Sequence, residues 1–203
     1  NAGRFSSIIQ RHGISVFKAG VTFLKSVMTN PQNRADVERY KLDSLKVATF
    51  CAEPTSPAVQ EFGMKLITPQ YINSYWATEH GGIVWTHPYG NKDLPLRADA
   101  HTYPLPWIFG DVWLTDGAAN HEGRYHYRPA EAEEKGEVVI TRPYPYLART
   151  IWGDSERVGD PSWCGDKKRF ESQYFSRYCK QDGTAAHVYL QGDYARKYAD
   201  GSF

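Results

Sequence analysis

Apolar positions in the first 90 residues recur with two alternating spacings, one typical of helices and one typical of strands. Helical spacing is found in three segments, residues 4–12, 21–28 and 57–66. Short β-branched and aromatic runs, typical of buried strands, are found at residues 14–17, 45–51 and 71–76. Ser56-Pro57 resembles an N-cap followed by proline in the first helical turn. The polar residues 30–43 fit either a loop or a surface helix. This alternation predicts an α/β layer with a largely parallel sheet.

The pattern changes after about Pro88, where the chain becomes rich in glycine, proline, aspartate and aromatic residues. Strand-like runs recur at residues 107–114, 123–127, 137–141 and 186–190. Turn signals such as Asp116-Gly117 and Asp182-Gly183 separate these runs. We therefore predict an α/β subdomain at residues 1–90 and a β-rich subdomain at residues 91–203. The second is expected to form a small distorted barrel.

Composition narrows the classes of protein to consider. The 203 residues are 41% hydrophobic with a net charge of +1, which suits a globular chain and gives no basic field for nucleic acid. The chain has three cysteines, Cys51, Cys164 and Cys179. A small and odd number of cysteines does not indicate a disulfide framework, so we expect a reducing, cytoplasmic location. No apolar run approaches the roughly 18 residues of a membrane span, and no membrane partner is expected.

Three short segments place reactive side chains at the end of a predicted strand. They are Phe50-Cys51-Ala52-Glu53-Pro54, residues 73–82, and Gln191-Gly192-Asp193. In open α/β sheets ligands bind at the carboxyl ends of the strands, and a strand-to-helix turn points free N–H groups at a ligand. Taken one at a time, each segment is better explained without a ligand. The first and the third fit ordinary turns, and residues 73–82 fit a buried aromatic strand followed by a solvated Glu79.

The side chains of these segments suit a nucleotide. Tyr75 offers a flat face for a base, and Trp76 alternates to the opposite side, where it can line a different pocket. The hydroxyl of Thr78 can donate to phosphate. Glu79 can hold Mg²⁺, which takes few protein carboxylates and completes its shell with water and phosphate oxygens. Asp193 can accept hydrogen bonds from both ribose hydroxyls.

In their order along the chain these segments resemble the adenylate-forming superfamily, and most closely its acetyl-CoA and propionyl-CoA synthetases. The family's Gly-Glu-Pro turn is similar to Ala52-Glu53-Pro54, and its aromatic-aromatic-x-Thr-Glu-x-Gly-Gly segment is similar to residues 75–82. Residues 148–157 match Ala-Arg-Thr-Ile-x-Gly-Asp-x-Glu-Arg, and Tyr-Phe-Ser-Arg follows at residues 174–177. The family's Thr-Gly-Asp is similar to Gln191-Gly192-Asp193. The resemblance covers nearly the whole chain and implies a fragment of the large N-terminal domain.

The resemblance also implies a role for individual residues. It assigns nucleotide binding to Ala52, Glu53, Pro54, Asn73, Ser74, Tyr75, Thr78 and Asp193. It places Cys51 and Trp76 in the acyl pocket, where the indole limits the length of the acid. Thr78 and Glu79 are implied to be catalytic, with Glu79 as the Mg²⁺ ligand. For His80, a variable position in the resemblance, we expect a local hydrogen-bonding role.

This sequence departs from the family pattern at several positions. Ala52 stands in place of glycine, Asn73 in place of aspartate, Ala77 in place of glutamine and Gln191 in place of threonine. Residues 164–166 lie in what is interpreted as an insertion. These departures favour a divergent branch, such as the synthetase part of a fused propionyl-CoA synthase that activates 3-hydroxypropionate.

The implied reaction uses ATP, Mg²⁺ and CoA to convert a short-chain carboxylic acid into an acyl-adenylate and then an acyl-CoA. A phosphate loop upstream and a mobile C-terminal domain downstream are expected in the same polypeptide, so the fragment alone is expected to be inactive. Two alternatives stay open. One is an adenylating enzyme that loads a carrier protein, and the other is a non-catalytic binding or assembly module.

Overall fold

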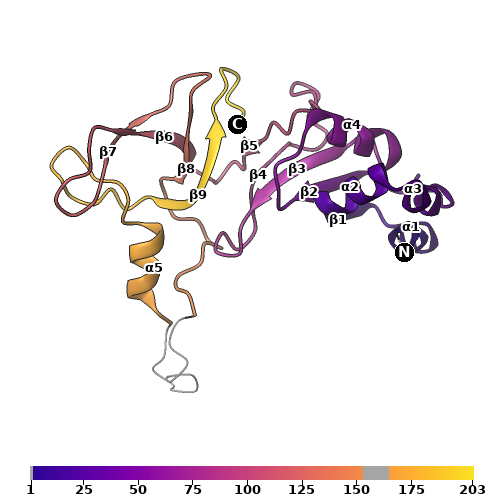
Figure 1. Ribbon diagram of the computed structural model, residues 1–203, viewed down its shortest axis with the longest axis horizontal. Helices are drawn as coiled ribbons and strands as arrows, with labels where there is room; N and C mark the ends of the chain where they lie inside the picture. The colour runs from indigo at the N-terminus through magenta and orange to yellow at the C-terminus, as the bar shows by residue number, and fades with distance from the viewer. Residues whose placement is uncertain (1, 153–164) are drawn as a thin grey trace. The chain divides into compact units, whose positions relative to one another are not determined.

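The computed structural model describes residues 2–152 and 165–203 (Figure 1). They form two compact units, which are described separately below. The first contains the residues up to Trp76 together with Ile83–Tyr103, and the second contains Ala77–Gly82 together with Pro104–Phe203. The predicted division at residue 90 falls inside the first unit. The part of the synthetase motif at residues 153–157, and Cys164, lie outside the described residues.

The first unit is built on a sheet with the strand order β1-β2-β3-β4-β5. Its strands are β1 (Val16–Gly20), β2 (Val47–Cys51), β3 (Tyr71–Trp76), β4 (Ile83–Thr86) and β5 (Tyr103–Pro104). β1, β2 and β3 are parallel, which confirms the predicted α/β layer, and β4 pairs antiparallel with β3. β4 and β5 were not predicted, because both are short and lie among turn-forming residues.

Four helices accompany this sheet (Figure 1): α1 (Gly3–His12), α2 (Val21–Thr29), α3 (Pro31–Glu38) and α4 (Pro57–Leu66). The polar segment that suited either a loop or a helix contains α3. Its N-terminus is capped by the side chain of Asn30, which accepts from the backbone of Gln32 and Asn33. Ser56 occupies the N-cap position of α4, but its side chain makes no capping hydrogen bond.

The core of the first unit packs the end of β2 against the start of β3. Phe50 of β2 and Tyr71 of β3 stack at 5.5 Å between ring centroids, and both are buried with Leu24 of α2. A Cβ atom added to Gly63 of α4 would lie 2.8 Å from the ring of Tyr71. Glycine therefore lets α4 approach the first residue of β3 closely, and this packing encloses Tyr71 together with Leu24.

The second unit contains an antiparallel sheet with the strand order β7-β6-β8-β9. Its strands are β6 (Gly110–Asp116), β7 (His126–Pro129), β8 (Lys135–Ile140) and β9 (Tyr189–Arg196). Among the described residues β7 and β9 remain edges, so the sheet is open and does not close into the predicted barrel. The predicted turns at Gly117 and Gly183 are confirmed, with φ of 75° and 83°.

Asp193 lies within β9, whereas the sequence placed it after the end of a strand. Leu190 and Tyr194 of β9 face Val139 and Glu137 of β8, so three residues of β9 oppose one residue of β8. Gly192 has a φ of 92°, which glycine adopts readily and which lets the chain bulge out of the ladder. The Gly-Asp pair was interpreted as a turn because a bulge and a turn use the same residues.

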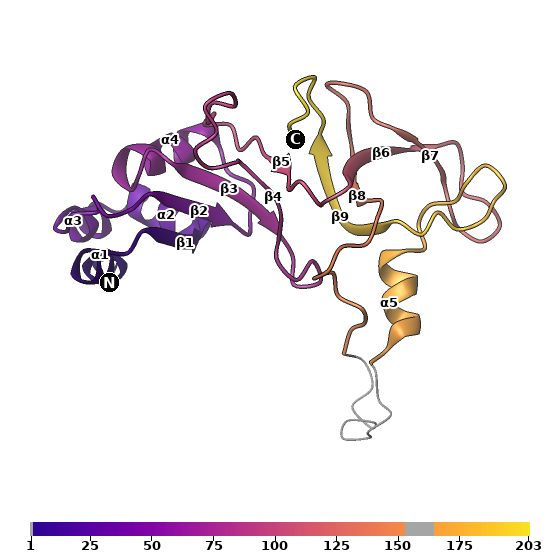
Figure 2. The same ribbon diagram turned by 180° about the vertical axis from the view of Figure 1, so that it is seen from behind.

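Helix α5 (Lys167–Tyr174) also belongs to the second unit and was not predicted from the sequence. Asp166 caps its N-terminus by accepting from the backbone N–H of Arg169. The helix contacts β9, near which it lies in Figure 2, and its two buried side chains are Phe170 and Tyr174. Two apolar positions in eight residues are too few for a clear helical pattern.

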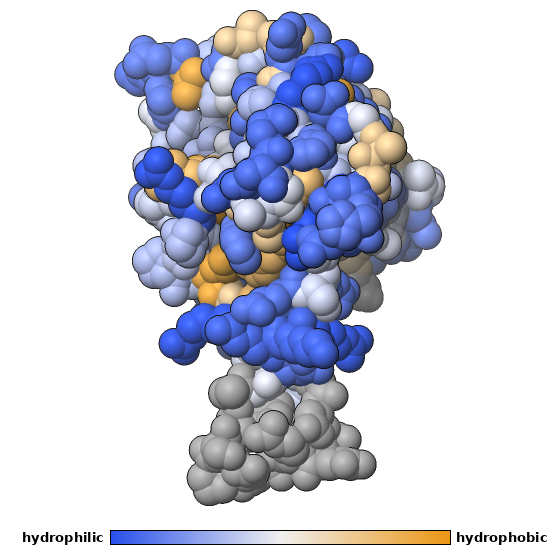
Figure 3. All heavy atoms as spheres, turned by 90° about the vertical axis from the view of Figure 1, so that its left-hand side faces the viewer, coloured by the Kyte–Doolittle hydropathy of each residue, from blue (hydrophilic) through white to orange (hydrophobic). Residues whose placement is uncertain are grey.

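The face drawn in Figure 3 is largely hydrophilic, and apolar atoms reach the surface there in patches between polar residues. Within the described part of the chain, no helix combines the length and the apolar composition needed to cross a membrane.

Candidate functional site

The turn after β2 has an unusual backbone. Ala52 has a φ of 84°, a left-handed conformation that glycine adopts freely and alanine does not. The conformation turns the chain away from the sheet directly after Cys51, the last residue of β2. Ala52 and Pro54 are exposed, and Cys51 is half-buried. The turn thus presents its backbone at the carboxyl edge of the parallel strands, as predicted for a ligand-binding segment.

The carboxylate of Glu53 is held by helix α2. Thr22 donates a hydrogen bond of 2.8 Å to one oxygen, and the ammonium of Lys25 lies 2.6 Å from the other. These interactions, with Lys25 first, lower the pKa of Glu53. The side chain therefore anchors the turn to α2.

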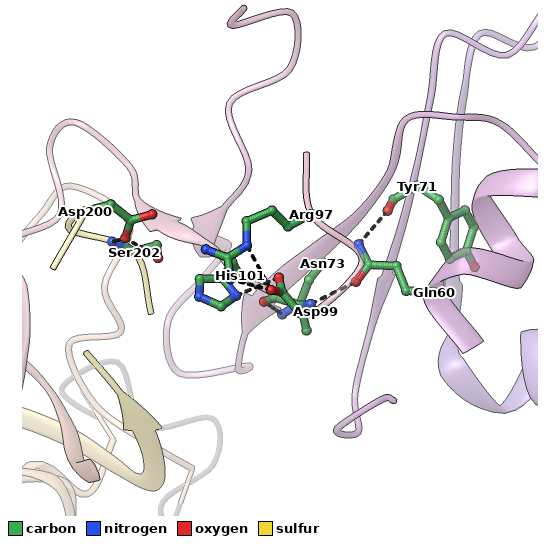
Figure 4. A network of polar contacts seen from close by, with 9 residues as sticks. Gln60, Tyr71, Asn73, Arg97, Asp99, His101, Asp200 and Ser202 are labelled. Atoms are coloured by element: carbon green, nitrogen blue, oxygen red, sulfur yellow. Dashed lines mark hydrogen bonds and ion pairs between the residues drawn. The ribbon is translucent and has the colours of Figure 1, made fainter. Parts of the chain in front are cut away.

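The third strand carries Asn73 and Ser74. The Ser74 hydroxyl is buried and donates to the carbonyl of Phe50 at 3.0 Å, which ties β3 to β2. The side-chain amide of Asn73 donates to the carbonyl of Ala100 at 3.0 Å (Figure 4). Both side chains thus have structural partners in the first unit. The polar head of Asn73 is oriented by the segment around Ala100, which sequence reasoning did not single out.

Figure 4 shows how this segment is fixed within the first unit. Gln60 donates to the carbonyl of Tyr71 at 3.0 Å and accepts from the backbone N–H of Ala100 at 2.8 Å. Asp99 accepts from Arg97 at 2.9 Å and lies 2.6 Å from Nδ1 of His101. A buried glutamine and a short charged cluster therefore hold the partner of Asn73 in place.

The two aromatic residues at the end of β3 have different surroundings. Tyr75 is half-buried and meets Trp85 edge to face at 5.8 Å. Trp76 is 42% exposed, and the ammonium of Lys18 lies 4.9 Å from the centroid of its ring. An ammonium over an indole is a cation–π interaction. The two rings thus have different neighbours, and the register of β3 against β4 shifts between Tyr75 and Trp76.

In the second unit, residues 77–82 form a compact turn. The backbone N–H of His80 donates to the carbonyl of Ala77 at 3.1 Å, and that of Gly81 donates to Thr78 at 3.0 Å. The backbone N–H of Ala77 donates to Nδ1 of His80 at 2.9 Å. This confirms the predicted local hydrogen-bonding role of His80 and fixes its tautomer, because the accepting nitrogen must be unprotonated.

The same turn is packed against the segment from Tyr144 to Ala148. Tyr144 donates to the carbonyl of His80 at 3.1 Å, and the backbone N–H of Ala148 donates to the carbonyl of Glu79 at 2.9 Å. Gly81 has a φ of 74°, and an added Cβ would lie 1.9 Å from the carbonyl oxygen of Tyr146. Only glycine permits this approach, so Gly81 sets how closely the turn packs on this support.

Glu79 and Thr78 differ in exposure and in hydrogen bonding. Thr78 is exposed. Glu79 is half-buried, and its Oε1 accepts a hydrogen bond of 2.8 Å from the hydroxyl of Tyr174 on α5. An oriented carboxylate beside an exposed hydroxyl suits Mg²⁺ that arrives with a nucleotide, because Mg²⁺ binds through one or two carboxylates plus phosphate oxygens. Glu79 could supply one such carboxylate, and the described residues contain no group of three or more His, Cys, Asp or Glu side chains that could hold a metal ion by themselves.

The turn that carries Glu79 and the strand that carries Asp193 meet at His80. His80 is 1% exposed, and its ring lies 5.2 Å from that of Tyr189, edge to face. Burial lowers the pKa of His80 to about 4, and the negative charges of Asp193 and Glu79 oppose that shift. Burial likewise raises the pKa of Tyr189, with Glu79 and Asp193 acting in the same direction. The bulge in β9 and the turn at Glu79 therefore lie close together.

The structure thus divides the predicted site residues between the two units. The second unit contains Thr78, Glu79 and Asp193. The first unit holds the predicted adenine and acyl residues, Cys51, Ala52, Glu53, Pro54, Asn73, Ser74, Tyr75 and Trp76. Sequence reasoning missed Tyr174 and Tyr189 as neighbours of Glu79 and His80. The only signal for Tyr174 was its place in the Tyr-Phe-Ser-Arg segment.

Comparison with known proteins gives matches over most of the chain. The model of a protein family described as AMP-binding enzyme matches residues 1–152. The acetyl-coenzyme A synthetase of Helicobacter acinonychis is 30% identical over 194 residues, which is 94% of this chain and 25% of that protein. The acetyl-coenzyme A synthetase of Chlorobaculum tepidum is 29% identical over 201 residues, 98% of this chain and 26% of that protein. The chain thus spans about a quarter of the length of these relatives.

A solved structure has a similar fold. The anthranilate CoA ligase AuaEII in complex with anthranoyl-AMP aligns with a TM-score of 0.65 at 17% identity. The alignment covers 99% of this chain and 31% of the ligase. At this identity the match shows a common fold for the aligned part.

Proposed function

Since the chain belongs to the family of AMP-binding enzymes, we propose that the full-length protein activates a short-chain carboxylic acid with ATP and transfers the acyl group to CoA. The observation that carries this proposal is the contact of His80 with Tyr189 at 5.2 Å, which joins the turn that carries Glu79 to the strand that carries Asp193. A metal-binding carboxylate and a ribose-binding carboxylate belong together at a nucleotide.

The proposal assigns a role in nucleotide binding to residues of each unit. In the second unit, Thr78 donates to phosphate, Glu79 binds Mg²⁺ and Asp193 accepts from the ribose hydroxyls. In the first unit, the backbone of Ala52, Glu53 and Pro54 contacts the base, with Asn73, Ser74 and Tyr75 beside it. The anchoring of Glu53 by Lys25 supports a structural part for its carboxylate in this turn.

The chemistry proposed for the protein is positioning and charge stabilisation. The ionised carboxylate of the acid attacks the α-phosphorus of ATP, pyrophosphate leaves, and the thiol of CoA then displaces AMP from the acyl-adenylate. Mg²⁺ would neutralise phosphate charge. The acid needs no general base, because it is already ionised. The turn at residues 77–82, immobilised on its support, would keep Thr78 and Glu79 in place without reorganisation.

The proposed substrates are acetate, propionate or 3-hydroxypropionate. Cys51 and the indole of Trp76 are proposed to line the acyl pocket, and the indole would leave space for two or three carbons. The departures from the family pattern, such as Ala52 and Gln191, support a divergent enzyme, and 3-hydroxypropionate is the acid that such a branch would use. The proposal includes a cytoplasmic location, which suits the free thiols of Cys51 and Cys179.

The test is ATP–pyrophosphate exchange by the full-length protein with acids of two to six carbons. The proposal predicts exchange that requires Mg²⁺ and is fastest with one of the three short acids. It also predicts that Glu79→Gln lowers exchange by orders of magnitude while CoA binding is retained. Exchange at the wild-type rate in that variant would remove Glu79 from the metal role.

The acceptor needs its own experiment. The full-length protein is supplied with the purified acyl-adenylate and with either CoA or, separately, a carrier protein that bears phosphopantetheine. The proposal predicts thioester formation with CoA. Transfer to the carrier alone would identify a carrier-loading enzyme, and the absence of exchange with every acid would leave a binding or assembly module.

A further inference from the structure

We propose that Tyr174 is a positioning residue that orients Glu79 and, through Tyr189, links it to the strand bulge that carries Asp193. This inference rests on the proposed function, because Glu79 and Asp193 are taken as the metal and ribose ligands. Neither tyrosine would touch the nucleotide. Each acts through a residue that does.

The first link is the hydrogen bond from Tyr174 to Glu79. The donor is 7% exposed, and the distance from its hydroxyl to Oε1 is 2.8 Å. A phenol carries its proton at neutral pH, so Tyr174 can donate to the carboxylate. A hydrogen bond to a charged acceptor is stronger than one between neutral groups. Occupying Oε1 in this way fixes the rotation of the carboxylate.

The second link is the stack between Tyr174 and Tyr189. Their rings are 5.5 Å apart with an interplanar angle of 14°. Phe170 packs against Tyr174 at 5.3 Å, and Phe175 meets Tyr189 at 5.6 Å. Four aromatic rings in contact leave little freedom for either tyrosine. The position of one ring therefore determines the position of the other.

The third link leads from Tyr189 to the bulge. Its hydroxyl is hydrogen-bonded to Oε1 of Gln191, the residue before Gly192-Asp193. Its ring also packs on His80, whose backbone belongs to the turn that carries Glu79. Tyr189 thus contacts both the turn and the bulge. A displacement of either ligand residue is resisted by the same pair of tyrosines.

Tyr174→Phe separates the hydrogen bond from the stack, because the ring remains and only the hydroxyl is removed. The experiment measures binding of ATP to the full-length protein by calorimetry, with Mg²⁺ and with a chelator. We expect binding of Mg-ATP to weaken about tenfold, equal to about 1.4 kcal/mol. Binding of metal-free ATP is expected to stay within about twofold, because Glu79 acts through the metal.

Tyr178→Phe is the matched control. Tyr178 is also buried, and its hydroxyl also donates to a carboxylate, Oε2 of Glu137 at 2.7 Å. Neither residue belongs to the proposed site. We expect this variant to bind Mg-ATP as the wild type does, even where its midpoint of thermal unfolding is lowered.

Tyr189→Phe tests the other half of the link. It keeps the stack and loses the hydrogen bond to Gln191, so we expect weaker binding of ATP both with and without Mg²⁺. Equal effects of Tyr174→Phe on Mg-ATP and on metal-free ATP, or equal losses in Tyr174→Phe and Tyr178→Phe, would overturn the positioning role. Absence of ATP binding by the wild type would instead contradict the proposed function.

Discussion

The imidazole of His80 meets the phenol ring of Tyr189 edge to face at 5.2 Å, and Nδ1 of His80 accepts from the backbone N–H of Ala77. The histidine is therefore held neutral in the folded protein. Its protonation would break the hydrogen bond to Ala77 and place a charge in a buried position. The turn that carries Glu79 is thus built around an uncharged histidine.

This burial makes stability depend on pH. The pKa of His80 is lowered to about 4 in the folded protein and has an ordinary value of 6.5 when unfolded. Between these pH values the unfolded state binds a proton that the folded state does not, which favours unfolding. The contribution of His80 to the free energy of unfolding is therefore fully present above pH 6.5 and is lost as the pH falls towards 4. We expect the loss to be about 3 kcal/mol at the lower end.

His80→Asn is the comparison for this prediction, because its side-chain oxygen can replace the accepting nitrogen but does not titrate. Denaturant unfolding at several pH values measures the difference in free energy of unfolding between wild type and variant. The wild-type advantage should shrink between pH 6.5 and 4. A constant difference across this range would show that His80 is not held neutral.

Gly81 should be intolerant of any side chain. Gly81→Ala places a Cβ 1.9 Å from the carbonyl oxygen of Tyr146, and we expect it to cost about 3 kcal/mol or more of unfolding free energy. Gly123→Ala is the control, because its φ of 76° is nearly the same and nothing lies within 4 Å. That change should cost about 1 kcal/mol. Similar losses in both variants would mean that the close approach to Tyr146 is absent.

Replacing Ala52 by glycine should stabilise the folded protein. At a φ of 84°, Ala52→Gly relieves the left-handed strain, and we expect it to raise the free energy of unfolding by about 1 kcal/mol. The exposed helical residue Ala58 supplies the opposite case, since Ala58→Gly should lower stability by about 1 kcal/mol. A loss of stability in Ala52→Gly would indicate a different backbone at this turn.

Trp76→Gly tests the proposed acyl pocket. Removing an indole opens space for additional methylene groups, each worth about 0.8 kcal/mol when buried. We expect the full-length variant to exchange pyrophosphate fastest with acids of four carbons or more. An unchanged preference for two- or three-carbon acids would separate Trp76 from chain-length selection.

Local features of the sequence were sufficient for most of the first unit. β3 was predicted at residues 71–76 and is found at Tyr71–Trp76, because its β-branched and aromatic residues have no competing helical pattern. The turn glycines at 117 and 183 were also predicted, since their backbone demands glycine. The relation of β4 to β3 was not, because it depends on pairing between strands.

The surroundings of the candidate site depend on contacts that no local pattern encodes. Tyr174 and Glu79 are 95 positions apart, and their hydrogen bond exists only because α5 packs on β9. Asp193 was recognised as a candidate, but its place on a bulge was not. The register of β9 against β8 decides that position, and Gly192 interrupts the alternation from which a strand is predicted.

The most direct test is a structure of the full-length protein with an ATP analogue and Mg²⁺. The account predicts one nucleotide whose ribose hydroxyls are hydrogen-bonded to Asp193 and whose phosphate-bound Mg²⁺ is coordinated by Glu79. A nucleotide bound at neither carboxylate, or bound at only one of them, would contradict it.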